Sequence, residues 1–336
     1  MPKKIRWLIA HYPLELFWRT AEQFAKELED MCPGEFEIEI HTTKSFNEQY
    51  DNKLSGFNYV KPNIKNLETK IDDRSTIDSI ENSKKWEEMF KSLEDSDFEM
   101  SQTPISIVGS YCDKSFVGLD LPFLFRDHDH VSNSLDNEIG NEFLANITKK
   151  RDIVGLGFTY SGGYRVIGAT ESIESLEDLK KLKMFTYTTP GKELFSLLGI
   201  DTIKTGELNK EDLEDIDHSG SIETTYLRFS GKHVLKTNHS MYMTTILVSK
   251  KFFDTLTDHQ KECYKIAAKK VAKLEREWSI ADAQKYEDMA KERGITIVNI
   301  TDEDRETLIA TAKKAYLNVN KKVGLNIDLI KKIILH

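Results

Sequence analysis

The sequence predicts an α/β protein built as two lobes, and three observations support this. The chain has 336 residues, which is more than one ordinary core holds and fits two lobes of common size. Hydrophobic residues make up 39% and charged residues 31%, the balance of a soluble globular protein. Strand and helix patterns alternate along both halves of the chain, which is typical of a mostly parallel sheet covered by helices.

The first 40 residues predict a strand, a helix and a second strand. An apolar run over residues 5–10 predicts a short strand, and a turn follows at residues 11–13. From Phe17 to Leu28 apolar residues recur at helical spacing. Residues 36–40 alternate between apolar side chains and glutamates, the pattern of a half-buried strand. This opening unit favours a parallel sheet crossed by a helix.

A polar stretch, residues 51–83, interrupts the alternation. A loop of this length is uncommon and is usually functional or mobile, so we interpret it as an inserted segment. A helix resumes at Trp86. Nearly continuous apolar runs then predict central strands at residues 104–109 and 152–158. Apolar residues at helical spacing from 135 to 147 predict a helix between these two strands.

The second half repeats the pattern of strand and helix. Strands are predicted at residues 165–169 and 183–187, with a late strand at residues 295–300. Ser175 and Asp178 have the spacing of a capping box, which predicts the start of a short helix between the first two strands.

A long helix is predicted near the C-terminus. Thr257 and Gln260 form its capping signal, and Gly294 is a typical end residue. At 1.5 Å per residue, about 36 residues extend for roughly 54 Å, which is enough to span two lobes. Thr301 and Asp304 cap one further helix.

Composition limits the partners of the chain. A net charge of −9 argues against nucleic acid, because a phosphate backbone would be repelled. No apolar run reaches the 18 or so residues that a membrane helix needs. Cys32, Cys112 and Cys263 are widely spaced and odd in number, so we interpret them as three unpaired thiols. The first residues lack the apolar region of a signal peptide, so either a leader has been removed or the chain is cytoplasmic.

Residues 118–130 (GLDLPFLFRDHDH) form the most specific motif. They resemble the signature of TRAP-type (tripartite ATP-independent periplasmic) solute-binding proteins of the DctP-like family, the extracytoplasmic receptors of a bacterial uptake system for small organic acids. Four further blocks match this family in the same order and together cover most of the chain: residues 9–11, 176–183, 237–239 and 248–254.

The resemblance implies a two-lobe fold like that of periplasmic binding proteins, with a ligand cleft between the lobes, hinge strands and a long helix spanning both lobes. It implies that residues 1–162 and 243–282 form the first lobe, and residues 163–242 and 283–325 the second. Residues 326–336 are expected to be a C-terminal tail, either an interaction surface or packed onto the second lobe.

The expected ligand site departs from the family at one residue. Most members fix the ligand carboxylate with an arginine two residues after the last lysine of the 176–183 block, and Phe185 occupies that position here. Phe185 and Tyr187 lie two apart on a predicted strand and therefore point to the same face. Two aromatic rings suit a flat or apolar ligand, and an aromatic residue at this spacing is equally typical of a core.

Arg165 is the cation that the site retains. The resemblance implies that Arg165 contacts the ligand carboxylate, with Tyr164 beside it in the cleft. The alternative is a surface or inter-lobe salt bridge. A single arginine favours a monocarboxylate with an apolar or aromatic body over a dicarboxylate.

Five more residues are ligand-binding candidates. His11 and Glu15 follow the first strand, where ligands bind in open α/β sheets, and a cap or core role is the alternative for His11. Tyr111 follows a predicted central strand. Thr224 or Tyr226 is expected to replace the polar contact that the family takes from an asparagine.

The function predicted from these residues is that of a receptor and not of an enzyme. Lobe closure is expected to capture a small organic carboxylate in the periplasm, an aromatic or apolar monocarboxylate being the form that Phe185 suggests. The receptor then delivers it to the membrane subunits of a TRAP transporter. No cofactor, metal or catalytic residue is expected, because His128 and His130 fall short of a metal-ligand set and are interpreted as part of a solvated turn. A monomer is expected, with a dimer as the alternative.

Two other functions are possible for the same fold. One is a cytoplasmic or sensory ligand-binding relative that has lost the transport role. The other is an enzyme that uses His11 and Glu15 as an acid–base pair, which turnover of a bound acid would reveal.

Overall fold

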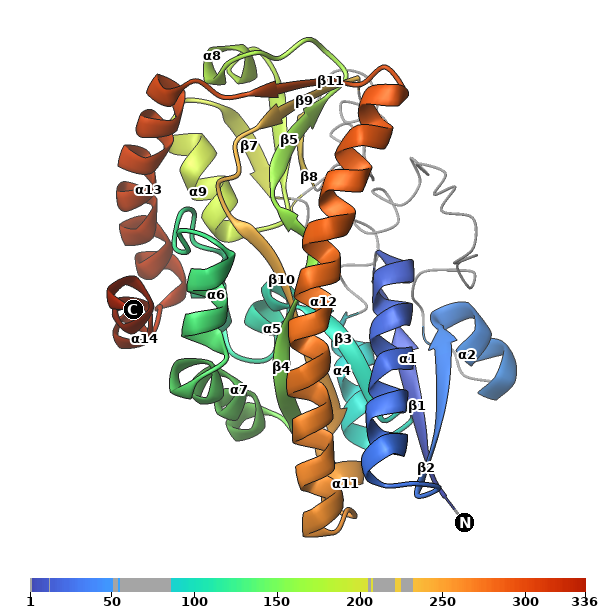
Figure 1. Cartoon of the computed structure of the whole chain (residues 1–336). Coiled ribbons are helices and arrows are strands. Elements are labelled where there is room, and N and C mark those ends of the chain that lie inside the picture. Colours follow the sequence, from blue (N-terminus) through green and yellow to red (C-terminus); the bar gives the residue numbers. More distant parts are fainter. Residues whose placement is uncertain are drawn as a thin grey trace.

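Two β-sheets, one above the other, form the centre of the molecule, and a long helix runs beside both (Figure 1). The computed structural model describes residues 2–11, 13–50, 54, 86–204, 207, 221–224 and 232–336. The first sheet has the order β2-β1-β3-β10-β4 and the second the order β11-β9-β5-β8-β6-β7.

The first sheet is mixed. Its strands are β1 (Lys3–Ile9), β2 (Phe36–Thr42), β3 (Met100–Pro104), β4 (Ile153–Tyr164) and β10 (Met241–Ser249). β1 pairs in parallel with β2 and β3, as the opening strand–helix–strand pattern predicts, whereas β10 is antiparallel to β3 and β4. Its helices are α1 (Leu14–Met31), α2 (Thr43–Tyr50), α4 (Trp86–Asp95), α5 (Ile105–Tyr111), η2 (Lys114–Asp120), α6 (His128–Leu135), α7 (Glu138–Lys150) and α11 (Lys250–Phe253).

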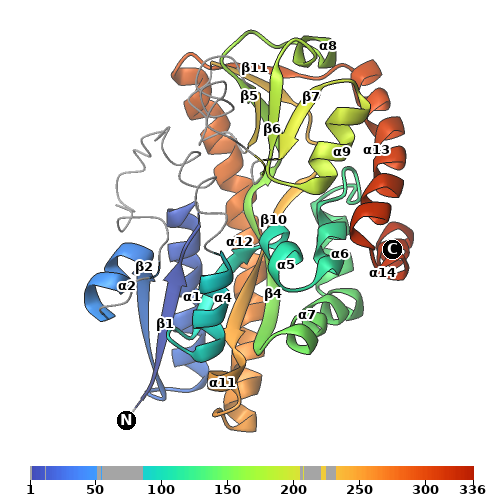
Figure 2. The same cartoon turned by 180° about the vertical axis from the view of Figure 1, so that it is seen from behind.

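The second sheet begins where β4 ends. Its strands are β5 (Val166–Ala169), β6 (Lys183–Thr186), β7 (Asp201–Lys204), β8 (Ser221–Thr224), β9 (His233–Lys236) and β11 (Thr296–Asn299). Helices α8 (Leu176–Leu179), α9 (Thr189–Leu197) and α13 (Asp302–Val323) flank it (Figure 2). Leu194 of α9 and Leu308 of α13 share a buried core with Ile167 and Met184 of this sheet.

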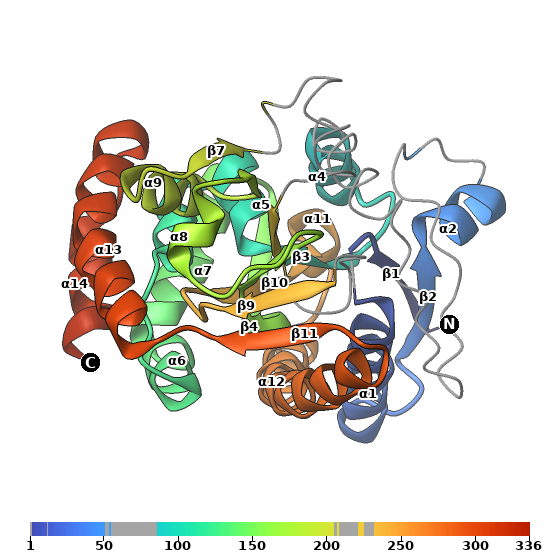
Figure 3. The same cartoon turned by 90° about the horizontal axis from the view of Figure 1, so that it is seen from above.

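Helix α12 (Asp258–Glu292) is the predicted long helix, and its capping box is present. The Thr257 hydroxyl accepts a hydrogen bond from the backbone N–H of Gln260, and the Gln260 side chain accepts one from the Thr257 N–H. Seen from above, α12 lies beside α1, and the two helices are packed together (Figure 3). Among the described residues, no helix is both long and apolar enough to cross a membrane.

Four sequence predictions differ from the structure. Residues 105–109 are the start of helix α5 and not a strand, because a short apolar run has no period that separates a buried strand from a buried helix. The helix predicted from residue 135 to residue 147 begins at Glu138 as α7, because Asn137 caps it, and Leu135 is the last residue of α6. Within the predicted solvated turn, His130 is buried in α6 and lies 2.9 Å from the Ile333 carbonyl oxygen.

The C-terminal segment accounts for the fourth difference. Helix α14 (Ile327–Leu335) packs on the core of the first sheet, not on the second lobe. Leu329, Ile330 and Ile333 are buried there, and Ile330 lies so close to Gly118 that a Cβ at Gly118 would be 2.5 Å from its Cδ1. The signature segment therefore uses a glycine where the C-terminal helix covers it.

Candidate functional site

Four charged or titratable residues meet between the two sheets, and we call them the Arg165 cluster: Arg165, Asp120, Glu223 and His239. They come from four separate segments: the β4–β5 junction, the end of η2, strand β8, and the connection between β9 and β10. All four side chains are buried, with at most 2% exposed. Buried charges need partners, and here the partners are one another.

Glu223 is the centre of the hydrogen bonding in the cluster. Its Oε1 lies 2.9 Å from His239 Nε2, and its Oε2 accepts a hydrogen bond from the Thr186 hydroxyl. The other ring nitrogen of His239 lies 2.8 Å from the Thr237 hydroxyl, so both sides of the imidazole are held. This arrangement fixes the ring orientation of His239 and satisfies the Glu223 carboxylate.

Helix α9 contributes its N-terminus to the same carboxylate. A Cβ added at Gly191, in the first turn of α9, would lie 2.9 Å from Glu223 Oε2 and 2.4 Å from the Thr186 hydroxyl oxygen. A glycine is therefore required for this close approach. The partial positive charge of a helix N-terminus favours a negative charge at this place.

Arg165 connects the two sheets. Its Nη2 lies 3.5 Å from Asp120 Oδ1, and its Nε lies 3.6 Å from Glu223 Oε1. Arg165 therefore forms an inter-lobe salt bridge, which is the alternative to ligand binding given above. Both contacts are long for charge-assisted hydrogen bonds, which usually measure 2.7–2.9 Å.

Two nitrogens of this guanidinium, Nε and Nη1, are buried and donate no hydrogen bond to any residue in the part of the chain that the structure describes. A buried donor without an acceptor costs on the order of 1–3 kcal/mol, and more when the group is charged. An additional anionic acceptor at Arg165 would remove this cost.

The electrostatics of the cluster favour a charged arginine. Burial lowers the pKa of Arg165, but Glu223 and Asp120 outweigh this effect and raise it. Burial likewise raises the pKa of Glu223, but Arg165 and His239 outweigh it, and the pKa of Glu223 falls to about 2. For Asp120, burial dominates and raises the pKa to about 6 despite Arg165. The charge of Asp120 therefore changes near pH 6.

Aromatic contacts link the cluster to the first strand. The Arg165 guanidinium carbon lies 4.0 Å from the centre of the Tyr242 ring, a cation–π contact. The Tyr242 hydroxyl lies 2.7 Å from His11 Nε2. The structure thus brings two predicted site residues, His11 and Arg165, into contact with the same residue, Tyr242.

The Glu15 carboxylate is engaged elsewhere. It accepts a hydrogen bond of 2.7 Å from the Tyr286 hydroxyl, which joins α1 to α12. Tyr111 lies beside α4, with its ring 6.4 Å from that of Phe90 and its carbonyl oxygen bonded to Arg151. Neither contact brings these two predicted residues to the Arg165 cluster.

Tyr164 points to a different cavity. Its ring lies 5.2 Å from that of His128, and both line a crevice of about 230 Å³ between the junction of the sheets and α12. Since Tyr164 and Arg165 are neighbours in an extended segment, their side chains point to opposite sides. The structure therefore does not bring Tyr164 and Arg165 together, and their ligand-binding roles stay predictions.

Phe185 is separated from Arg165 in the same way. Thr186 points to Glu223, so its neighbour Phe185 faces the other side of the second sheet, where it is completely buried. Tyr187, just after β6, is half-buried. Thr224 is paired in the sheet with Val166, and Tyr226 lies outside the described residues. Phe185 and Arg165 therefore do not share one pocket wall.

Sequence reasoning missed four residues of the cluster and its surroundings: Asp120, Glu223, His239 and Tyr242. Asp120 belongs to the signature segment and His239 to the 237–239 block, so their place in these motifs was the available signal. No local pattern links the four residues. The pairing of β8 with β5 brings Glu223 to the β4–β5 junction, and the pairing of β10 with β4 brings Tyr242 there.

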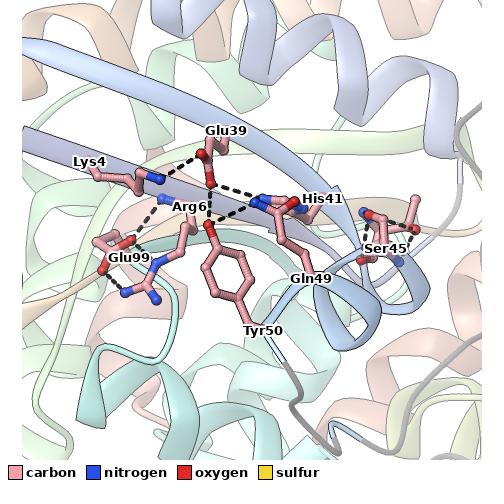
Figure 4. Close-up of polar contacts among 9 residues, drawn as sticks. Lys4, Arg6, Glu39, His41, Ser45, Gln49, Tyr50 and Glu99 are labelled. Carbon is pink, nitrogen blue, oxygen red and sulfur yellow. Dashed lines mark hydrogen bonds and ion pairs between the residues drawn. The ribbon is translucent and has the colours of Figure 1, made fainter.

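A second polar group lies at the edge of the first sheet (Figure 4). The Glu39 carboxylate accepts a hydrogen bond of 2.7 Å from Lys4 Nζ and another from the Tyr50 hydroxyl. Beside it, the Arg6 guanidinium donates to the Glu99 carboxylate. Lys4 and Tyr50 lower the pKa of Glu39 to about 2. These contacts fasten α2 to β1 and β2, and we interpret them as structural.

Comparison with known proteins gives three findings. The model of a family described as bacterial extracellular solute-binding protein, family 7 (DctP) matches residues 46–205 and 221–322. An uncharacterised protein of Haemophilus influenzae is 26% identical over 254 residues, covering 70% of this chain and 73% of that protein. The 2,3-diketo-L-gulonate-binding periplasmic protein YiaO of Escherichia coli is 27% identical over 197 residues, covering 56% of this chain and 59% of YiaO.

Solved structures show the same fold at low sequence identity. The sugar acid binding protein DctPAm of Advenella mimigardefordensis, in complex with galactonate, has a TM-score of 0.75 at 18% identity, covering 99% of this chain and 97% of that one. A TRAP periplasmic solute-binding protein of Ralstonia eutropha with bound (S)-2-acetolactate has a TM-score of 0.73 at 16% identity, covering 98% and 97%. These likenesses confirm the two-lobe α/β fold.

Proposed function

Because the chain belongs to family 7 of the bacterial extracellular solute-binding proteins, and is a TRAP-type receptor for small organic acids, we propose that its ligand is a monocarboxylate held by Arg165. The family is extracellular by its description, so capture takes place outside the cytoplasm. Delivery to the membrane subunits of a TRAP transporter follows from the same membership.

The observation that carries this proposal is the guanidinium of Arg165. It is buried and charged, and two of its nitrogens donate no hydrogen bond to the described residues. A carboxylate can accept from Nη1, and in the planar, two-bond geometry that arginine favours it would share Nη2 with Asp120. In a site without water such bonds are stronger than at a surface.

Capture is proposed to involve movement of the two lobes. Arg165 is only 1% exposed, so a ligand reaches it when the lobes separate and is enclosed when they close. Asp120 belongs to a helix of the first lobe and Glu223 to the second sheet, so the ion pairs of Arg165 join the two lobes. An anion at Arg165 would add an attraction that only the closed form provides, which shifts the population toward closure.

The preference for one carboxylate rests on the single arginine that the site retains. The family places its carboxylate-binding arginine at the position of Phe185, and the replacement removes a cation from this face of the second sheet. Dicarboxylates, which gain from a second cation, and sugar acids, whose hydroxyl groups need polar partners, should bind less tightly than acids with an apolar or aromatic body.

The test combines native mass spectrometry with thermal denaturation. Purified protein is first screened for a small molecule released on unfolding. It is then titrated with benzoate, a branched aliphatic monocarboxylate, gluconate and succinate. The expected result is a rise in Tm with the first two acids and little change with the others. A protein that carries no small molecule and is stabilised by none of these acids would contradict the proposal.

Three variants assign the result to residues. Arg165→Lys keeps the charge that Asp120 and Glu223 need but loses the planar fork, and it should lose most of the ligand-induced rise in Tm. Arg126→Ala removes an exposed arginine of the signature segment and serves as the control. An unchanged Tm response in Arg165→Lys would remove Arg165 from the site. Phe185→Arg should gain a response to succinate if the position controls selectivity.

A further inference from the structure

Two of the three cysteines, 231 residues apart in the chain, lie in contact. The Sγ atoms of Cys32 and Cys263 are 2.9 Å apart, and both residues are buried, with 1% and 3% exposed. Cys32 ends helix α1 and Cys263 lies in the second turn of α12. Sequence spacing alone had indicated three separate thiols. We propose that Cys32 and Cys263 are a redox site that closes to a disulfide between α1 and α12.

The geometry requires only a small change to form the bond. A disulfide places its two sulfurs about 2.05 Å apart, so the two Sγ atoms must approach by less than about 1 Å. Helices α1 and α12 are already packed together, so side-chain rotation is sufficient and no helix has to move far. Cys112 is different. It follows helix α5, and its Sγ lies 3.9 Å from the Ile147 carbonyl oxygen.

His259 gives the site its access route. Its Nε2 lies 3.7 Å from both sulfurs, and the residue is exposed. Burial raises the pKa of Cys32 to about 12, so the thiolate is scarce without a nearby base. Because His259 is exposed and touches both sulfurs, the pair lies next to the surface, where an exchange partner can reach it.

The oxidation balances as a thiol–disulfide exchange. One of the two cysteine thiolates attacks a sulfur of an external disulfide, either of an oxidoreductase or of a small molecule, and displaces one thiolate from it. The second cysteine then attacks the mixed disulfide and releases the other thiolate. Two electrons pass to the external disulfide, which ends as two thiols and takes up the two protons lost by Cys32 and Cys263.

A metal site is the other chemistry that these three side chains suggest. Their donor atoms lie within 4.8 Å of one another, and they form the one such group of three in the part of the chain that the structure describes. Structural zinc takes four protein ligands, and Zn–S bonds of about 2.3 Å in a tetrahedron hold two sulfurs roughly 3.8 Å apart. Three ligands and sulfurs at 2.9 Å therefore favour the disulfide.

The consequence is a covalent link within the first lobe. It would join the N-terminal strand–helix unit to the start of α12, far along that helix from the second sheet. Lobe movement is therefore left free. The proposal rests on the proposed function only in its extracytoplasmic setting, which supplies the oxidising conditions such bonds need.

The experiment counts thiols in the intact protein. Protein incubated with oxidised glutathione, and a second sample incubated with dithiothreitol, are denatured, alkylated with iodoacetamide and weighed. One adduct, at Cys112, is expected in the oxidised sample and three in the reduced one. Peptide mapping should recover a linked pair containing Cys32 and Cys263. Three adducts after oxidation, or glutathione attached to either cysteine, would overturn the proposal.

Variants and a metal measurement complete the test. Oxidised wild type should unfold on the order of 5–10 °C above the reduced form, and Cys112→Ser should behave the same. The double variant Cys32→Ser/Cys263→Ser should show no redox-dependent change in Tm. One zinc ion per chain in native mass spectrometry, protecting both thiols from oxidation, would identify a metal site instead. The ligand-induced rise in Tm is measured on both redox forms. This measurement tests ligand capture, so failure of the disulfide proposal and failure of the proposed function can be told apart.

Discussion

Replacing Glu275 with glutamine should stabilise the protein at alkaline pH. Glu275 is completely buried in the middle of α12. Its carboxyl group accepts hydrogen bonds from the backbone N–H of Tyr160 at 2.7 Å and from the side chain of Gln102 at 3.1 Å. Burial is the largest effect on this group and raises its pKa from 4.5 to about 8, although both hydrogen bonds oppose the rise.

The magnitude follows from proton linkage. Because the pKa is higher in the folded than in the unfolded chain, the folded form binds the proton more tightly. The contribution of Glu275 to stability is complete below pH 4.5 and is lost as the pH rises through about 8. Each pH unit in this window costs at most about 1.4 kcal/mol, so the free energy of unfolding should fall by about 4–5 kcal/mol by pH 8.

Glutamine is expected to fit the same place without titrating. Its oxygen can accept the bond from Tyr160, and its amide group can donate to Gln102 once the Gln102 amide is turned over. Turning the amide replaces the hydrogen bonds that Gln102 Nε2 donates to the Thr159 and Thr244 hydroxyls, and these hydroxyls can donate to Oε1 instead. The variant should match wild type below about pH 4.5 and exceed it progressively from there to about pH 8.

Urea unfolding followed by tryptophan fluorescence, at several values between pH 5 and pH 8.5, measures this difference. Glu277→Gln, which changes an exposed glutamate on the same helix, is the matched control and should show no such trend. If the stability difference between Glu275→Gln and wild type is the same at every pH, Glu275 does not titrate in this window and the reasoning is refuted.

Three other predictions concern the Arg165 cluster and the first lobe. Asp120→Asn should bind a monocarboxylate about tenfold more tightly than wild type at pH 7.5 and equally at pH 5, measured by calorimetry, because burial raises the pKa of Asp120 to about 6 and only the ionised form competes for the arginine. Gly191→Ala should abolish the ligand-induced rise in Tm, since its Cβ would lie 2.4 Å from the Thr186 hydroxyl oxygen; an unchanged rise would separate α9 from the site. Gly140→Ala should destabilise the fold by roughly 3 kcal/mol or more in urea unfolding, because its Cβ would lie 1.8 Å from the carbonyl oxygen that ends α6.

The placement of the predicted residues shows where sequence reasoning stops. His11 and Arg165 do meet at Tyr242, whereas Phe185 and Tyr164 point away from the arginine. On a strand, neighbouring side chains alternate between faces, so a shift of one residue decides which side chains share a site. The lobe boundaries and the ligand-binding roles stay predictions until a ligand is measured.

The sequence by itself determined the elements whose signals are local. Periodic apolar residues and caps predicted α1, β2 and α12, and the motif of residues 118–130 indicated the family. These signals lie within a few residues of one another, where covalent geometry and hydrogen bonding set the conformation.

Only the tertiary structure decided which distant residues meet. The Arg165 cluster joins four segments, α14 covers the first lobe, and Cys32 reaches Cys263 across 231 residues. Each of these contacts depends on strand register, sheet order and the packing of whole helices. Such properties arise from the sum of many weak interactions over the molecule, and no short segment encodes them.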